Sequence, residues 1–284
     1  MNETYLDILL SVPNDDSLRE TIAYQLHELG FGGLMEDQDG LHAYILREYW
    51  DNALQMSLQA VSNTHAPHSI AISSITEIKN QNWNRQWEES IQPIAITERI
   101  TITPSWHPLP DQGQKIVLII DPKMSFGTGY HESTRLVLRL LEQYLIADST
   151  VLDVGTGTGI LAIAAVKLGA RFAIGVDIDE WSYVNGKENV ERNRLVKYVE
   201  VRHGSLDVVH EREFTVIMAN ITRNAIIELL PAMLGKLQKD GLLLLSGLMA
   251  DDRAVMERTL QQHRCTLLSV INENEWIGIA ARRD

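Results

Sequence analysis

The chain has little of what a secreted, membrane-bound or metal-binding protein needs. One cysteine, Cys265, excludes an internal disulfide bond and a multi-cysteine zinc site. Its apolar stretches, such as Leu242 to Leu245, are far shorter than the roughly 20 residues of a membrane-spanning helix. Glu3 and Asp7 stand near the start without a basic residue, unlike the beginning of a secretory signal. These absences predict a cytoplasmic protein without a membrane partner.

Basic residues are also scarce relative to acidic ones. Lys and Arg number 25 against 38 Asp and Glu, which gives a net charge of −13. A phosphate backbone would be repelled by this charge, so we expect no direct nucleic-acid partner and consider a basic partner the better fit. Hydrophobic residues make up 45% of the 284 residues, which predicts a folded chain of about two domains.

The first 79 residues predict a small α+β domain. Apolar residues alternate along the expected strands and repeat at helical spacing along the expected helices. The order is strand, helix, two strands, helix and strand, at 4–12, 17–29, 31–36, 41–47, 51–62 and 70–78. This βαββαβ order is typical of a ferredoxin-like domain. Because it holds no catalytic cluster, we expect a role in recognition.

Residues 80–105 are expected to connect this domain to a larger one at 106–284. Trp83 and Trp87 lie four apart in the connection, and we interpret them as packing between domains in preference to touching a substrate. Beyond residue 116, short apolar segments alternate with helical patterns, which is typical of a doubly wound, mostly parallel sheet. The expected strands are 151–154, 172–177, 198–202, 214–219 and 242–246, followed by an antiparallel edge pair at 265–271 and 276–281.

A glycine-rich turn follows the expected strand at 151–154. Gly155, Gly157 and Gly159 let the backbone approach a ligand closely and aim free N–H groups at it. Asp177 ends the next strand, about 20 residues on, where its carboxylate can accept hydrogen bonds from both ribose hydroxyls. A dinucleotide fingerprint would need glycine at position 160, where Ile160 stands, so NAD is the weaker interpretation.

With these motifs the chain resembles the class I S-adenosylmethionine-dependent methyltransferases, and more closely the bacterial methyltransferases of large-subunit ribosomal protein L-eleven. The most specific segment is MSFGTGYHEST at 124–134, which places F-G-T-G-x-H ahead of the glycine turn. Further similar segments are 82–93, 153–159, 175–179 and 219–221. The resemblance covers nearly the whole chain. It implies an α/β, Rossmann-like methyltransferase domain with a mostly parallel seven-stranded sheet, preceded by a ferredoxin-like domain that docks the protein substrate.

The resemblance also implies S-adenosylmethionine as the cofactor. The loop 126–129 is expected over its methionine end, and Thr134 is expected among its contacts. The full expected set is Phe126, Gly127, Thr128, Thr134, Asp153, Gly155, Gly157, Gly159, Asp177, Ile178 and Asn220. Two departures from the family pattern concern the turn and the adenine. Thr156 replaces a cysteine or glycine, and residues 203–205 lack the acid that many methyltransferases offer to the adenine amino group.

Methyl transfer from a sulfonium is an in-line displacement that needs no metal, and positioning can lower its barrier by roughly 7–11 kcal/mol. The acceptor must be a free amine, and deprotonation at neutral pH costs a lysine roughly 4–5 kcal/mol but an α-amino group only about 1. We expect Asn220 and Ile221 to be catalytic, because the side-chain oxygen of Asn220 and the carbonyl of Ile221 can accept hydrogen bonds from the amine. An Asx turn that ends the strand is the alternative role for Asn220.

Two further patterns bear on the substrate and on metals. Methyltransferases of base amino groups usually carry N-P-P-[YF] where this chain has N-I-T-R at 220–223, so a nucleobase is disfavoured. His131-Glu132 does not continue to H-E-x-x-H, because Arg135 stands at the last position, and we expect no metal site. His131 is instead expected to order the cofactor loop or to cap the following helix.

Three asparagines four residues apart are interpreted as a solvated helix face or an amide ladder, and not as a site: Asn185, Asn189 and Asn193.

The sequence therefore predicts a protein methyltransferase that transfers methyl groups from S-adenosylmethionine to amines of ribosomal protein L-eleven, on lysine side chains or the N-terminus. Two alternatives stay open. One is a class I methyltransferase of another protein or of a small-molecule amine, and the other is a non-catalytic assembly factor that binds the cofactor. A nucleotide-dependent oxidoreductase is opposed by the spacing of the glycines.

Overall fold

The computed structural model describes residues 4–12, 22, 25–26, 29–31, 33–36, 40–64, 71–79, 91–110, 113, 115–121, 127 and 129–284. The chain divides into two compact units, Met1–Gln86 and Trp87–Asp284. This division falls inside the segment predicted to connect two domains, and residues 94–95 and 100–103 of that segment form strands of the second unit. Trp83 and Trp87, interpreted above as packing between domains, lie outside the described residues.

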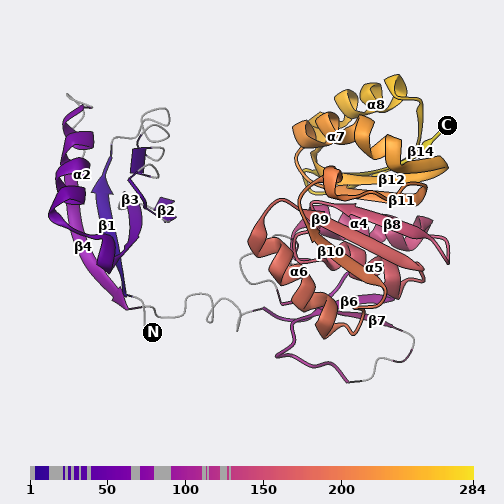
Figure 1. The fold of residues 1–284 in the computed structure, drawn as a ribbon, viewed down its shortest axis with the longest axis horizontal. Helices are drawn as coiled ribbons and strands as arrows, with labels where there is room; N and C mark the ends of the chain where they lie inside the picture. The colour runs from indigo at the N-terminus through magenta and orange to yellow at the C-terminus, as the bar shows by residue number, and fades with distance from the viewer. Residues whose placement is uncertain are drawn as a thin grey trace. The chain divides into compact units, whose positions relative to one another are not determined.

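The first unit is an antiparallel sheet with the strand order β2-β3-β1-β4 (Figure 1). This is the strand order of a ferredoxin-like fold. Alternate residues of β1, such as Leu6 and Ile8, are buried and pack with residues of β3 and with Ile22 and Leu26. The predicted helix at 17–29 lies mostly outside the described residues. The observed elements are β1 (Thr4–Ser11), β2 (Gly33–Glu36), β3 (Leu41–Leu46), η1 (Arg47–Tyr49), α2 (Asn52–Thr64) and β4 (Ala71–Lys79).

The second unit begins with a small sheet that the sequence patterns did not predict. Strands β5 (Ile94–Ala95) and β6 (Ile100–Thr103) are antiparallel, and β6 pairs in parallel with β7 (Ile116–Ile119). Ile100 of β6 and Leu118 of β7 are fully buried in the core of the second unit. Strand β7 lies at the edge of this sheet.

The large sheet of the second unit has seven strands in the order β10-β9-β8-β11-β12-β14-β13, so the predicted α/β architecture is confirmed (Figure 1). Strands β8 to β12 pair in parallel, and β14 is antiparallel to both of its neighbours. The predicted antiparallel pair occupies one edge, but the last strand along the chain is the inner one. The strands are β8 (Thr150–Val154), β9 (Phe172–Asp177), β10 (Val199–His203), β11 (Phe214–Asn220), β12 (Leu237–Met249), β13 (Cys265–Glu273) and β14 (Trp276–Arg283).

Helices cover both faces of this sheet, and each strand therefore contributes alternate residues to two cores. In β11, Val216 and Met218 face the core beneath the helices α4 to α6, whereas Ile217 and Ala219 face the core beneath α7 and α8. The helices are α4 (Glu132–Tyr144), α5 (Ile160–Lys167), α6 (Glu180–Arg192), α7 (Arg223–Lys236) and α8 (Arg253–Gln262), with η2 (Leu206–Val208) and η3 (Ala250–Asp252) as short 3₁₀ turns.

Among the described residues no helix combines the length and the apolar composition required to cross a bilayer.

Candidate functional site

The glycine turn lies between the end of β8 and the start of α5, as the sequence predicts. Gly155, Gly157 and Gly159 have φ values of 72°, 54° and 79°, in the left-handed region that favours glycine. A Cβ on Gly155 would also lie only 2.3 Å from Cγ2 of Ile221. The glycines therefore provide both the backbone conformation and the space for a close approach.

The N–H groups of this turn are used within the protein. Those of Gly155 and Thr156 donate to the carbonyl of Val176, at 2.9 and 3.0 Å, and that of Gly159 donates to the Thr156 carbonyl at 2.9 Å. The N–H of Gly157 donates to Oδ2 of Asp177 at 2.8 Å. The prediction that the turn aims free N–H groups at a ligand is therefore wrong for these four groups. Those of Gly155, Thr156 and Gly157 fix the turn to the end of β9 instead, and that of Gly159 closes the turn on itself.

Asp153 lies beneath the turn and has no exposed surface. Its Oδ2 accepts a hydrogen bond of 2.6 Å from the Thr156 hydroxyl, so Thr156, the departure from the family pattern, has a structural role. Burial raises the pKa of Asp153 to about 7, and the nearby charge of Asp177 adds to this, while the hydrogen bond from Thr156 opposes it. Asp153 does not line the cleft described below.

Asp177 lies at the carboxyl end of β9 and lines the cleft beside Ile178. Its Oδ2 accepts from the N–H of Gly157, and its Oδ1 accepts from the N–H of Asp179 at 3.0 Å. Each carboxylate oxygen can accept a further hydrogen bond, so Asp177 is held in place and still able to bind hydroxyl groups. The side chain of Ile178 is 76% exposed and forms an apolar rim.

A cleft of about 530 Å³ opens above the carboxyl ends of the parallel strands, within the range typical of small-molecule sites. This is the edge at which open α/β sheets bind ligands. Its walls come from α4, from the ends of β8, β9 and β11, from α7, and from the antiparallel part of the sheet. The lining residues are His131, Ser133, Val154, Gly155, Gly157, Val176, Asp177, Ile178, Ser182, Gly204, Ser205, Asn220, Ile221, Thr222, Ala225, Leu229, Gly247 and Trp276.

Asn220 ends β11 at the floor of this cleft and is only 8% exposed. Its Nδ2 donates to the hydroxyl of Thr134 at 3.2 Å. Its Oδ1 is buried and accepts no hydrogen bond from the described residues, so the Asx-turn alternative is not observed. Thr134 is fully buried and holds the Asn220 amide in this orientation from α4. An unpaired buried carbonyl oxygen costs roughly 1–3 kcal/mol, which a ligand with an N–H group can offset.

Gly247 is a site residue that the sequence analysis did not identify. It has a φ of 80° and lies where the pairing of β12 with β14 shifts register between Leu245 and Leu248. A Cβ at Gly247 would lie 2.3 Å from the carbonyl oxygen of Ile221. The bulge thus makes room for the backbone that follows Asn220. A lone glycine inside an apolar strand was the available signal.

Trp276 is the second residue that the sequence analysis missed, and it lines the cleft from the start of β14. Its ring meets that of His131 edge to face, with the ring centroids 4.5 Å apart. His131 caps α4, because its Nδ1 accepts from the N–H of Ser133 at 3.2 Å, so the capping interpretation is confirmed. No local pattern marks Trp276, since the pairing of distant strands brings it to the cleft.

The structure therefore brings together at one cleft six of the residues expected to act, while three others lie below its surface. The six are Gly155, Gly157, Asp177, Ile178, Asn220 and Ile221. Thr134, Asp153 and Gly159 do not line it. Gly127 is buried, and its carbonyl accepts a hydrogen bond of 2.6 Å from the Thr158 hydroxyl. Phe126 and Thr128 lie outside the described residues.

Metal binding has no candidate in the described part of the chain, where no three His, Cys, Asp or Glu side chains form a cluster able to hold an ion.

A seven-stranded sheet with β14 inserted antiparallel beside β12, a glycine turn after β8 and an acid at the end of β9 defines the class I methyltransferase fold. The profile of the family described as ribosomal protein L11 methyltransferase (PrmA) matches residues 12–284. The chain belongs to this family, and the predicted resemblance is confirmed.

Individual relatives carry the same description. A ribosomal protein L11 methyltransferase of Chlorobaculum tepidum is 33% identical over 283 residues, which cover 97% of this chain and 96% of that protein. One from Clostridium perfringens is 37% identical over 202 residues, 71% of this chain. This second match spans 64% of the relative's length, slightly less than two thirds.

A solved structure agrees with the fold. The crystal structure of a ribosomal protein L11 methylase from Lactobacillus delbrueckii subsp. bulgaricus is 29% identical and superposes with a TM-score of 0.63. It covers 68% of this chain and 100% of its own length.

Proposed function

We propose that this chain is an S-adenosylmethionine-dependent methyltransferase that transfers methyl groups to amines of ribosomal protein L11. The observation that carries the proposal is the buried Oδ1 of Asn220 at the floor of the cleft, next to the glycine turn, which accepts no hydrogen bond from the part of the chain that the structure describes. An amine N–H is the donor that this oxygen lacks.

The cleft fits the cofactor in its shape and in its polar groups. Gly155 lets the turn lie against Ile221, where a Cβ would come within 2.3 Å of Cγ2, and Asp177 presents carboxylate oxygens for the ribose hydroxyls. Ile178 supplies an exposed apolar surface for the adenosyl group. The bound cofactor would supply an electrophilic methyl group on a sulfonium.

Asn220 and Ile221 are proposed to orient the acceptor amine. A neutral amine that donates one N–H to Oδ1 of Asn220 and a second to the Ile221 carbonyl directs its lone pair away from both oxygens, toward the cleft. The Thr134 hydroxyl holds Nδ2 of Asn220, which leaves Oδ1 as the amide atom available to the acceptor amine. Apolar walls from Val154, Leu229 and Trp276 exclude water around the reacting groups.

Asp153 and Thr134 are proposed to act indirectly. Both are fully buried, so Asp153 would support the cofactor through the conformation of the turn and Thr134 through the orientation of Asn220.

The proposed substrate rests on the relatives, which are named for ribosomal protein L11. The acidic chain, with its net charge of −13, suits a basic ribosomal protein. We propose that residues 1–79 recognise this substrate, that 80–105 connect the two functions, and that 106–284 carry the chemistry. A cytoplasmic location follows from this role, because ribosomal proteins are made there.

Intact-mass spectrometry of unmethylated ribosomal protein L11, incubated with the purified protein and S-adenosylmethionine, tests the proposal. We expect mass gains of whole methyl groups. Asn220→Ala should reduce the rate at saturating substrates by about 10²-fold or more. Asn224→Ala is the matched control, since this exposed amide on α7 pairs only with its neighbour Arg223 among the described contacts and does not line the cleft. Its rate should equal that of the wild type.

Calorimetry with S-adenosylmethionine separates the alternatives. Cofactor binding without methylation of L11 or of small-molecule amines would support the assembly-factor alternative and contradict the proposal. Unchanged turnover of a folded Asn220→Ala variant would remove Asn220 from the mechanism.

A further inference from the structure

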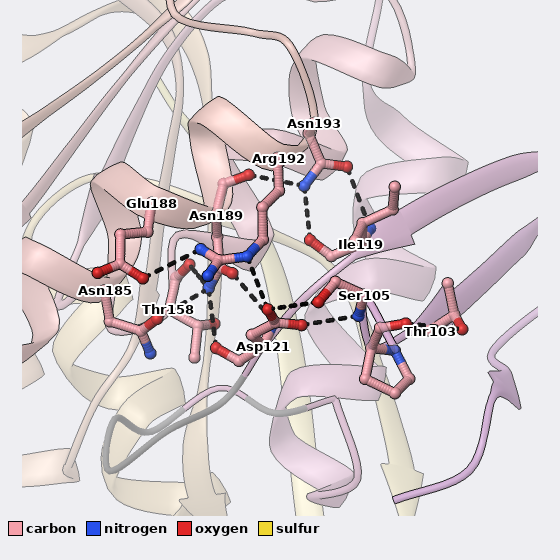
Figure 2. A network of polar contacts seen from close by, with 11 residues as sticks. Thr103, Ser105, Ile119, Asp121, Thr158, Asn185, Glu188, Asn189, Arg192 and Asn193 are labelled. Carbon is pink, nitrogen blue, oxygen red and sulfur yellow. Dashed lines mark hydrogen bonds and ion pairs between the residues drawn. The ribbon is translucent and has the colours of Figure 1, made fainter. Parts of the chain in front are cut away.

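Two asparagines of α6 and the asparagine at its C-cap form a buried network and not a solvated helix face. Asn185, Asn189 and Asn193 are 2%, 0% and 8% exposed, so the solvated-face interpretation is wrong. The amide-ladder interpretation holds only for the first pair, because Nδ2 of Asn189 donates to Oδ1 of Asn185, whereas Nδ2 of Asn193 donates to the backbone carbonyl of Asn189 (Figure 2). Buried amides are costly unless their hydrogen bonds are satisfied. The partners of these side chains therefore show what the network holds together.

Asn193 and Asn189 bind the backbone at the last residue of β7 and two residues after it. Oδ1 of Asn193 accepts from the N–H of Ile119 at 3.1 Å, and its Nδ2 donates to the Ile119 carbonyl at 2.6 Å. Asn189 forms the same pair of bonds with Asp121: its Oδ1 accepts from the N–H of Asp121 at 3.0 Å, and its Nδ2 donates to the Asp121 carbonyl at 3.3 Å. Four residues of helix rise about 6 Å and two residues of strand about 6.6 Å, so successive amides match alternate strand residues. The two side-chain amides therefore form, at the edge of the small sheet, the hydrogen bonds that the backbone of a neighbouring strand would form.

Asn189 differs from Asn193 in its further partners, one of which belongs to the glycine turn. Its Nδ2 also donates to the carbonyl of Thr158 at 3.0 Å and to Oδ1 of Asn185 at 3.4 Å, whereas the further acceptor for Asn193 is the carbonyl of Asn189 itself, at 2.8 Å. Figure 2 shows Asn189 between Thr158 and Asp121. Thr158 in turn binds the Gly127 carbonyl through its hydroxyl. A single side chain thus connects the turn to Asp121.

Asp121 is a firm anchor for this connection. It is 5% exposed, and its carboxylate accepts from the N–H of Ser105 at 2.7 Å and from the Ser105 hydroxyl at 2.8 Å. Nε of Arg192 lies 2.6 Å from Oδ2 of Asp121. Arg192 also belongs to α6, so the same helix holds Asp121 by its backbone and by its side chain.

Helix α6 also approaches the turn directly at Gly186, one turn before Asn189. A Cβ at Gly186 would lie 3.1 Å from the Gly157 carbonyl oxygen, and a Cβ at Gly159 would lie 3.4 Å from the Gly186 carbonyl oxygen. Gly157, Thr158 and Gly159 are therefore all located by α6.

We infer that Asn189 is a positioning residue for the cofactor site, because its amide holds the Thr158 peptide against Asp121 and so sets the place of the glycine turn. This inference rests on the proposed function, since it assumes that S-adenosylmethionine binds at the turn. Asn189 itself does not line the cleft.

Calorimetric titration of the full-length chain with S-adenosylmethionine, joined with L11 methylation rates and urea unfolding, tests the inference. Asn189→Ala should weaken cofactor binding about tenfold and raise the KM for the cofactor equally, with kcat nearly unchanged at saturation. Asn193→Ala is the matched control, because it loses the same kind of strand pairing and a similar amount of stability but leaves Thr158 untouched. Its dissociation constant should stay within about twofold of the wild type.

A second pair of variants covers the case in which Asn189→Ala fails to fold. Arg192→Gln loosens the Asp121 anchor, whereas Glu188→Gln removes another partner of Arg192, at 3.1 Å, without touching Asp121. Arg192→Gln should weaken cofactor binding and Glu188→Gln should not. If Asn189→Ala binds the cofactor as tightly as Asn193→Ala, and Arg192→Gln as tightly as Glu188→Gln, the inference is overturned. The network would then have a structural role only. A wild-type protein that does not bind S-adenosylmethionine would overturn the proposed function, and the inference with it.

Discussion

Replacing Asp153 with asparagine should change the pH dependence of stability. The carboxyl group has no exposed surface, and burial raises its pKa from 3.8 to about 7, with Asp177 adding to the increase. The folded state therefore holds a proton that the unfolded state releases near pH 4. The contribution of this group to the free energy of unfolding is therefore greatest below pH 4. It falls as the pH rises from 4 to 7 and stays low above pH 7.

The size of the effect follows from the pKa difference. About three pKa units at 1.36 kcal/mol each give a loss of roughly 4 kcal/mol between pH 4 and pH 8. The amide of the Asp153→Asn variant keeps an oxygen for the Thr156 hydroxyl, which donates at 2.6 Å in the wild type, but it cannot ionise. Relative to the wild type, this variant should therefore gain roughly 4 kcal/mol of unfolding free energy on going from pH 4 to pH 8.

Urea unfolding at closely spaced pH values, followed by circular dichroism, measures this difference. The matched control is Asp251→Asn, which removes an exposed carboxyl in the 3₁₀ turn η3 and leaves the buried one in place. If the Asp153→Asn variant and the wild type differ by the same free energy at pH 4 and pH 8, the carboxyl does not carry the proton and the reasoning fails.

Two further predictions concern the antiparallel side of the cleft. Gly247→Ala places a Cβ 2.3 Å from the Ile221 carbonyl oxygen, at a residue whose φ is 80°. We therefore expect thermal unfolding to show a stability loss of about 2 kcal/mol or more. The methylation rate should fall by a larger factor than the affinity for the cofactor, which calorimetry measures. Equal losses would mean that the Ile221 carbonyl has no special role. Although burial raises the pKa of Glu273, the hydrogen bond from Arg135 and the charges of Arg135 and Arg139 lower it on balance. Glu273→Gln should therefore cost about 1–2 kcal/mol at pH 7, and this cost should shrink as the pH falls below 4.5 and through the lowered pKa of Glu273, in urea unfolding with and without salt. A cost that does not shrink as the pH falls would contradict the ion-pair account.

The parts of the site that the sequence predicted depend on local patterns. The strand before Gly155, the helix after Gly159 and the strand that ends at Asp177 each carry their own spacing signal, and the structure places all three as expected. Asn220 follows from the same logic, because it ends a buried strand next to the glycine turn. Neighbouring parallel strands bring their carboxyl ends to one edge, so local signals suffice for this half of the cleft.

The parts that were missed depend on contacts between distant segments. Trp276 reaches the cleft because β14 pairs with β12, and the buried face of α6 around Asn189 becomes visible only once the segment at Asp121 lies against it. Polar side chains along one face of a helix normally indicate that this face is exposed to solvent. Such side chains are buried only where another part of the chain supplies backbone groups for their hydrogen bonds. Strands β5 and β6 are too short for a periodicity to identify them.

The position of β14 inside the sheet has a consequence for the order in which the protein folds during synthesis. Its residues, Trp276–Arg283, follow β13 along the chain but lie between β12 and β13. Until a ribosome has made them, β12 keeps an open edge of unpaired backbone groups, and β13 has nothing to pair with. The wall of the cleft that holds Trp276 is also missing at that stage. The second unit therefore completes its sheet and its cleft in a single late event, when its final strand enters between two others already made.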